Sequence, residues 1–153
     1  MTIAVGDTAP DFTLQGSTGD PVTLSSFQGE RPVAVVFYPF TFTGVCQGEL
    51  CQLRDDHRQF EQAGVQVLAI SCDTAPAQKK WAEEMGYQFP VLSDFWPHGE
   101  VSKAYGVFND KLGCAMRYTF LIGKDGRVVD VFDSGAIGTP RESGRYAEGL
   151  AKL

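Results

Sequence analysis

The stretch that decides the fold is Val33–Phe60, with the sequence VAVVFYPFTFTGVCQGELCQLRDDHRQF. It opens with a run of β-branched and aromatic residues, which is the pattern of a buried strand. A loop follows from Pro39 to Gly44, after which apolar residues such as Leu50 and Leu53 recur at the spacing of one helix face. The stretch therefore predicts a strand, a tight connection and a helix, with Cys46 at the start of that helix.

A cysteine in this position is suited to act as a nucleophile. The first backbone N–H groups of a helix have no partner within it, and the helix dipole is positive there, so a thiolate is favoured. Pro39, Thr43 and Cys46 form the pattern P-x-x-x-T-x-x-C. Thr43 can bring a hydroxyl near the sulfur and a substrate oxygen, and Pro39 can shield one side of the thiol and fix the loop backbone.

The remaining sequence predicts an α/β fold around this unit. The helix is expected to end at Ala63-Gly64, and Val65–Ile70 is a second buried strand, which makes a βαβ unit and a partly parallel sheet. The segments Ala9–Leu14 and Pro21–Leu24 predict an N-terminal β-hairpin. The other expected elements are a helix at Pro76–Met85, a strand at Phe89–Leu92, a helix at Gly99–Tyr105, a hairpin of Arg117–Ile122 with Val128–Phe132, and a helix at Glu142–Leu150.

Length and composition set the broad class. A chain of 153 residues with 43% apolar residues suits one globular domain, residues 1–153. The net charge of −6 argues against nucleic acid or an anionic membrane as partner. No signal peptide or bilayer-spanning run is evident, and four cysteines without a secretory signal suggest a reducing compartment. We therefore expect a cytoplasmic protein.

Two segments make the chain resemble a known family. Phe42-Thr43-Gly44-Val45-Cys46-Gln47-Gly48-Glu49-Leu50 and Leu92-Ser93-Asp94-Phe95-Trp96-Pro97-His98-Gly99 are similar to segments of peroxiredoxins, in particular the one-cysteine alkyl hydroperoxide reductase E type of actinobacteria. The resemblance runs from about Val5 to Val131. It implies a thioredoxin-like fold, with a central mixed β-sheet flanked by helices and an N-terminal β-hairpin, in agreement with the pattern above.

The resemblance also implies a chemistry and a set of partners. Cys46 would reduce hydrogen peroxide and organic hydroperoxides and become a sulfenic acid, without a cofactor. The reductant would be thioredoxin, or a glutaredoxin-like protein with a low-molecular-weight thiol, and the protein would be a homodimer. Arg117 matches the family arginine that stabilises the thiolate and binds peroxide, and Glu49 matches the residue that holds this arginine. Considered alone, they are a surface arginine and an ordinary first-turn glutamate.

The sequence also allows other roles for Cys46. Cys46 could be an inert packed cysteine, or the nucleophile of a hydrolase with His57 or His98 as its base. His57 continues the apolar face of the helix, which favours packing, and His98 has no evident orienting partner. The four cysteines lack the paired spacing of a zinc site. A non-enzymatic peroxide sensor, redox relay or holdase would use the same Cys46 chemistry, so the sequence does not separate it from a peroxidase.

The other cysteines leave open how a sulfenic acid would be resolved. Cys51 has the spacing of the resolving cysteine in the bacterioferritin comigratory, or Q, type of peroxiredoxin. Five helical residues span a rise of about 7.5 Å and a turn of about 140°, whereas a disulfide tolerates a Cα separation of about 7 Å, so a Cys46–Cys51 bond requires the helix to unwind. Cys51 could instead be a packing residue. Cys72 is expected to pack, while Cys114 is expected in a loop, exposed and available as a second resolving thiol. No cysteine follows Cys114, which argues against a resolving thiol in a C-terminal tail.

A group of aromatic residues lies close in sequence to these positions and predicts an apolar mouth suited to organic hydroperoxides. Its members are Phe40, Phe42, Phe95, Trp96 and Tyr118.

Overall fold

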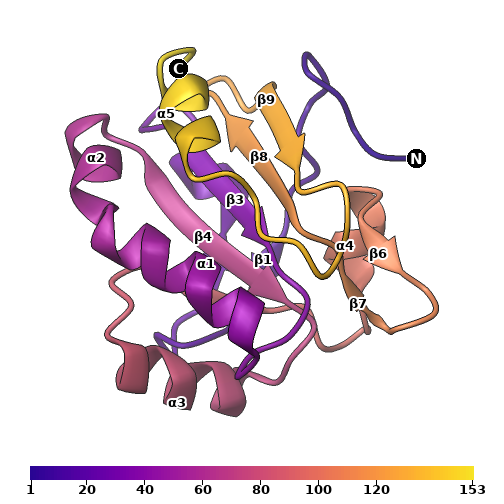
Figure 1. The fold of residues 1–153 in the computed structure, drawn as a ribbon. Helices are drawn as coiled ribbons and strands as arrows, with labels where there is room; N and C mark the ends of the chain where they lie inside the picture. Colours follow the sequence, from indigo (N-terminus) through magenta and orange to yellow (C-terminus); the bar gives the residue numbers. More distant parts are fainter.

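The computed structural model describes all residues from 1 to 153 and is built around one five-stranded sheet in the order β5-β4-β3-β8-β9 (Figure 1). Its strands are β3 (Val33–Phe37), β4 (Gln66–Ser71), β5 (Val91–Ser93), β8 (Tyr118–Ile122) and β9 (Val128–Asp133). The central strand β3 pairs in parallel with β4 and antiparallel with β8, so the predicted mixed sheet is confirmed.

Two short antiparallel pairs lie outside this sheet. The predicted N-terminal hairpin is present as β1 (Thr13–Leu14) and β2 (Val22–Thr23). The second pair, β6 (Phe108–Asn109) with β7 (Cys114–Ala115), was not predicted, because two-residue strands leave almost no periodic pattern.

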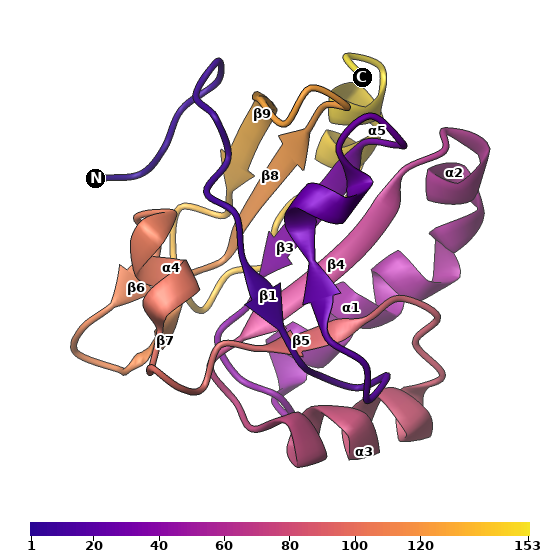
Figure 2. The same ribbon diagram turned by 180° about the vertical axis from the view of Figure 1, so that it is seen from behind.

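Helices cover both faces of the sheet (Figures 1 and 2). Helices α1, α2, α3 and α5 cover one face, and the N-terminal hairpin, the 3₁₀ helix η1 and α4 cover the other. Their bounds are η1 (Leu24–Phe27), α1 (Gly44–Asp55), α2 (His57–Gln62), α3 (Ala75–Met85), α4 (Glu100–Ala104) and α5 (Gly144–Leu150). None of these helices is both long enough and apolar enough to cross a bilayer.

Successive side chains of β3 point to two different buried faces of the sheet, which explains why the strand is a continuous apolar run. Ala34 and Val36 point into the core beneath α1, whereas Val33, Val35 and Phe37 point into the core beneath α4 and the N-terminal segment. Since both faces of the strand are buried, no polar residue interrupts it.

The single helix expected up to Ala63 is in fact two helices. Helix α1 ends at Asp55 and α2 begins at His57, with Asp56 between them at φ −92° and ψ 10°. The side chain of Asp56 accepts a hydrogen bond from Gln52 Nε2 at 2.7 Å, an (i, i+4) pair of the kind that ordinarily supports a helix, so this bond does not explain the break. His57, the first residue of α2, is half-buried, and its Nε2 lies 3.1 Å from Oε1 of the exposed Glu61. The prediction of one continuous helix is therefore wrong at Asp56, although Leu53 and Phe60 on either side of the break lie in the same core cluster.

One edge of the sheet gathers the ends of several elements. The carboxyl ends of β3, β4, β5 and β9 meet there with the amino end of β8, because β8 runs antiparallel to β3. Helix α1 starts at this edge. The connection of residues 134–143, drawn in yellow in Figure 1, runs from β9 past α1 to α5.

Candidate active site

Cys46 is the third residue of α1 and is fully buried at this edge. The first N–H group that bonds within the helix is that of Gln47, which donates to the Thr43 carbonyl at 2.8 Å. The N–H groups of Gly44, Val45 and Cys46 therefore have no acceptor within the helix, and the Thr43 side chain does not cap them. The structure thus has the predicted thiol at a helix N-terminus, where unpaired donors and the helix dipole favour negative charge.

Arg117 lies directly before β8, and its side chain reaches the sulfur of Cys46. Its Nη1 donates to Cys46 Sγ at 3.2 Å and to Glu49 Oε1 at 2.7 Å, and its Nε donates to the carbonyl of Ile137. Its second terminal nitrogen, Nη2, makes no hydrogen bond to the protein. The Arg117 side chain is 6% exposed. The site therefore holds a fixed cation against the sulfur, with one donor nitrogen still free.

Glu49 is held by a second arginine that the sequence did not reveal. Arg141 donates to Glu49 Oε2 from its backbone N–H at 2.7 Å and from Nε at 3.0 Å, and to Oε1 from Nη2 at 2.9 Å. It also donates to the carbonyl of Phe37 at 2.7 Å, and its side chain is only 1% exposed. Burial alone would raise the pKa of Glu49, but the charge and hydrogen bonds of Arg141, together with Arg117, lower it below its usual value. One buried carboxylate thus faces two buried cations, which leaves a net positive charge beside the sulfur.

Arg141 could not have been found from local sequence. It follows Pro140 in the polar, glycine-rich connection between β9 and α5, where a single arginine is normally solvated. Its burial is produced by the way this connection closes over α1.

The loop before α1 differs in one detail from the prediction. Pro39 is buried, as expected for a residue that shields the thiol. The Thr43 hydroxyl, however, donates to the carbonyl of Phe40 at 2.6 Å and makes no hydrogen bond to Cys46. With its proton committed to Phe40, the Thr43 oxygen can accept a hydrogen bond from a ligand but cannot donate one.

The remaining cysteines occupy different environments. Cys51 is half-buried on α1, and its sulfur lies 3.7 Å from the hydroxyl of Tyr87. Cys72 is buried with its sulfur 3.8 Å from Ser102 Oγ, and burial raises its pKa to about 12. Cys114 is fully buried in β7, and burial raises its pKa to about 11. The prediction that Cys114 is exposed is wrong, because β7 pairs with β6 and packs against the sheet.

No disulfide joins the four cysteines, and no cluster of histidine, cysteine and acidic side chains is arranged to hold a metal ion. Neither histidine is bonded to Cys46 in the manner of a hydrolase base. His98 contacts the carbonyl oxygens of Phe95 and Gly113 at 3.1 and 2.7 Å.

Four of the five predicted aromatic residues are exposed, and the fifth is half-buried. Phe40, Phe42 and Phe95 are 39%, 51% and 45% exposed, and Trp96 is 82% exposed. Phe42 also packs against the buried Trp81, with a ring-centroid distance of 6.1 Å. Tyr118 instead stacks on Phe120.

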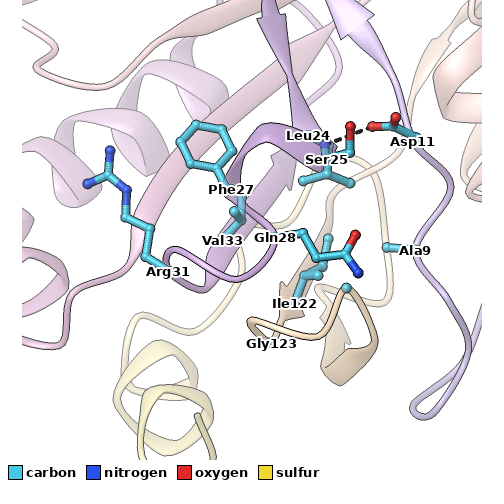
Figure 3. Close-up of a pocket in the computed structure, with 11 residues that line it drawn as sticks. Ala9, Asp11, Leu24, Ser25, Phe27, Gln28, Arg31, Val33, Ile122 and Gly123 are labelled. Atoms are coloured by element: carbon cyan, nitrogen blue, oxygen red, sulfur yellow. Dashed lines mark hydrogen bonds between the residues drawn. The ribbon is translucent and has the colours of Figure 1, made fainter.

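A small cavity of about 50 Å³ lies at the opposite end of the sheet, next to η1 (Figure 3). Val33 and Ile122 line it from the sheet, and the Ser25 N–H donates to Asp11 Oδ1 beside it at 2.9 Å. None of the predicted site residues lines this cavity. The candidate active site is therefore the arrangement around Cys46.

The chain is similar to a family of known proteins over most of its length. Residues 5–131 match the AhpC/TSA family. The chain is 46% identical over 149 residues to the alkyl hydroperoxide reductase E of Mycobacterium tuberculosis, covering 97% of each chain. It is 37% identical over 137 residues to the peroxiredoxin Bcp of Escherichia coli, covering 86% of each. The crystal structure of peroxidoxin BcpB from Mycobacterium tuberculosis superimposes with a TM-score of 0.85 at 34% identity, covering 97% of this chain and 94% of the other.

Proposed function

Since this chain belongs to the AhpC/TSA family of peroxiredoxins, which are thiol peroxidases, we propose that Cys46 is its peroxidatic nucleophile. The Cys46 thiolate attacks the terminal oxygen of a peroxide. An S–O bond forms as the O–O bond breaks, and the leaving oxygen takes a proton and departs as water or an alcohol. Cys46 is left as a sulfenic acid.

The observation that carries this proposal is the contact of Arg117 Nη1 with both Cys46 Sγ and Glu49 Oε1. Negative charge moves from the sulfur to the leaving oxygen during attack, so donors fixed near both atoms stabilise the transition state. Arg117 supplies Nη1 to the sulfur and leaves Nη2 free for a peroxide oxygen. Glu49, itself held by Arg141, fixes the guanidinium in that orientation.

The loop and the helix end complete the peroxide site in this proposal. The unpaired N–H groups at the start of α1 donate toward the sulfur and the bound oxygens. Thr43 accepts a hydrogen bond from the O–H of the peroxide, a role supported by the commitment of its own proton to Phe40. Pro39 shields the thiol from bulk solvent. Because Cys46 is fully buried, peroxide enters only when the residues that cover it shift slightly.

We propose that an external thiol resolves the sulfenic acid, with Cys51 as the alternative. The thiol attacks the oxidised sulfur, releases water and leaves a mixed disulfide that a second thiol reduces. A bond to Cys51 would instead unwind the part of α1 that contains Glu49, whose carboxylate accepts four hydrogen bonds from the two arginines. This cost supports a reductant from outside, either thioredoxin or a glutaredoxin-like protein with a low-molecular-weight thiol. We further propose that the chain is a single domain, that it forms a homodimer and that it resides in the cytoplasm.

We also infer that organic hydroperoxides are substrates beside hydrogen peroxide. The exposed side chains of Phe40, Phe42, Phe95 and Trp96 offer apolar surface to an alkyl group. The expected result is that tert-butyl hydroperoxide or a fatty-acid hydroperoxide reacts at least as fast as hydrogen peroxide. A far slower reaction would contradict this inference.

The variant Cys46→Ser tests the function. We expect it to fold and to lose peroxide consumption in the presence of a thiol reductant. The matched control is Cys51→Ala, on the same helix, which should keep the first oxidation at the wild-type rate. Fast peroxide consumption by Cys46→Ser would rule out the proposed nucleophile.

A further inference from the structure

We propose that Asp73, just beyond the carboxyl end of β4, is a positioning residue that holds the loop Pro39–Thr43 in the conformation that reacts with peroxide. The inference rests on the proposed function of Cys46. It extends the site to a residue that follows a neighbouring strand and makes no hydrogen bond to the sulfur.

The carboxylate of Asp73 is the tether between β4 and this loop. Its Oδ2 accepts the backbone N–H of Thr41 at 2.8 Å and the hydroxyl of Ser71 at 2.7 Å. Ser71 is fully buried, and its Oγ also accepts from Gln78 Nε2 at 2.9 Å. The oxygen that receives the loop is therefore fixed by a buried hydrogen-bonded chain.

Thr41 is held at its side chain as well as at its backbone. Its hydroxyl lies 2.9 Å from the hydroxyl of Tyr38, which is fully buried at the end of β3. Thr41 itself is only 9% exposed. A buried N–H that lost Asp73 as its acceptor would be left unpaired, so the loop would have to rearrange to solvate it.

The residue after Thr41 shows what this tether maintains. Phe42 has φ 63° and is the only residue other than glycine with a positive φ. An aromatic side chain is sterically disfavoured in this region and stays there only when its neighbours fix it. Thr43 then returns to an extended backbone and leads directly into the free N–H groups of α1. A change at Phe42 would therefore move both the Thr43 hydroxyl and the start of the helix.

The negative charge of Asp73 offers an anionic group at this site no electrostatic advantage. Burial and, in addition, the Asp73 carboxylate raise the pKa of both Tyr38 and Cys114, so this negative charge disfavours further anions at the site. A carboxylate near a reacting thiolate is a disadvantage if only charge is considered. We therefore assign its role to the hydrogen bond that it accepts from Thr41.

The test compares Asp73→Ala with Asp73→Asn, which removes the charge but keeps an oxygen that can accept the Thr41 N–H. Two rates of Cys46 are measured in each protein, one with hydrogen peroxide and one with iodoacetamide, which needs the thiolate but no peroxide geometry. The matched control is Asp7→Ala. Asp7 also accepts a backbone N–H at 2.8 Å, from Ala4, but it lies at the opposite end of the sheet.

We expect Asp73→Ala to lower the peroxide rate by about 10- to 100-fold, the size of loss that a misplacement of about 1 Å produces. Its alkylation rate should be unchanged or higher, because a looser loop uncovers the sulfur. Asp73→Asn should keep its peroxide rate within about threefold of wild type, and Asp7→Ala should change neither rate. If Asp73→Ala does not fold, Tyr38→Phe removes the other tether of Thr41 and should lower the peroxide rate selectively.

Three results would overturn the proposal. Asp73→Ala, or Tyr38→Phe in its place, could react with peroxide at the wild-type rate. Asp73→Asn could lose as much as Asp73→Ala, which would assign the effect to charge. The peroxide and alkylation rates could change together. A joint fall would assign the effect to the general reactivity of the Cys46 thiol, and a joint rise would show that the loop only limits access to the sulfur. If the wild-type protein itself did not react with peroxide, the proposed function of Cys46 would fail. That outcome differs from failure of the Asp73 proposal, in which the wild-type protein reacts.

Discussion

Replacement of Glu49 by glutamine tests the charge arrangement on which the site depends. The Glu49 carboxylate is 6% exposed and accepts four hydrogen bonds, three from Arg141 and one from Arg117. Glutamine has the same shape but no charge, and its NH₂ group must face an arginine donor. Breaking a buried ion pair by removing one partner costs about 3–5 kcal/mol, because a buried charge is left uncompensated. Because two arginines share this carboxylate, we expect Glu49→Gln to lower the free energy of unfolding by an amount within this range.

Thermal unfolding followed by circular dichroism measures this cost. For a chain of this length each kcal/mol corresponds to about 2–4 °C, so the Tm of Glu49→Gln should fall by roughly 6–20 °C at pH 7. The matched control is Glu84→Gln, which breaks an exposed pair with Lys80 at 3.4 Å and should change stability by less than about 0.5 kcal/mol.

The pH dependence gives the same prediction an independent check. The pKa of Glu49 is lowered in the folded protein, so its stabilising contribution is present above its ordinary value of 4.5 and is lost as the pH falls through the folded value. The difference between wild type and Glu49→Gln should therefore be constant from about pH 6 to 8 and shrink below about pH 4.5. A Tm within 2 °C of wild type at pH 7 would refute the reasoning.

Four further predictions concern individual residues. Arg117→Lys should lower the peroxide rate by about 10²- to 10³-fold, because an ammonium cannot hold Cys46, Glu49 and a peroxide oxygen in one plane; a rate within tenfold of wild type would contradict this. With iodoacetamide at pH 8, Cys51 should be labelled before Cys114, whose pKa of about 11 and full burial protect it, and peptide mapping that finds Cys114 labelled first would be the opposite result. The raised pKa of Cys114 also predicts that stability declines as the pH rises from about 9 through about 11, measurable by urea titration. Cys51→Ser should leave the lifetime of the Cys46 sulfenic acid unchanged in the absence of external thiol, whereas a longer lifetime would identify Cys51 as the resolving thiol.

The sequence predicted the parts of the site that local pattern determines. The apolar run of β3, the loop and the start of α1 follow one another without a gap, so Cys46 had to lie at a helix N-terminus near the carboxyl edge of the sheet. Arg117 was expected beside it through family resemblance, and the antiparallel pairing of β8 with β3 explains why an arginine distant in sequence reaches the same edge.

The features that the sequence did not predict depend on tertiary packing. Arg141 lies in a loop that is polar by composition, and its burial comes from closure of that loop against Glu49 and the Phe37 carbonyl. Cys114 was expected to be exposed because it was placed in a loop, but a two-residue strand buries it. The break at Asp56 was missed because the apolar spacing continues across it, from Leu53 to Phe60.

The most direct test of the account is the intact mass of the fully reduced protein after one equivalent of hydrogen peroxide, without external thiol. We predict the gain of one oxygen, located at Cys46 by a sulfenate-trapping reagent. Loss of two hydrogens, with a peptide that links Cys46 to Cys51, would keep Cys46 as the nucleophile but overturn resolution by an external thiol. An unchanged mass would contradict the central claim, because the Cys46 thiol would then not react with peroxide.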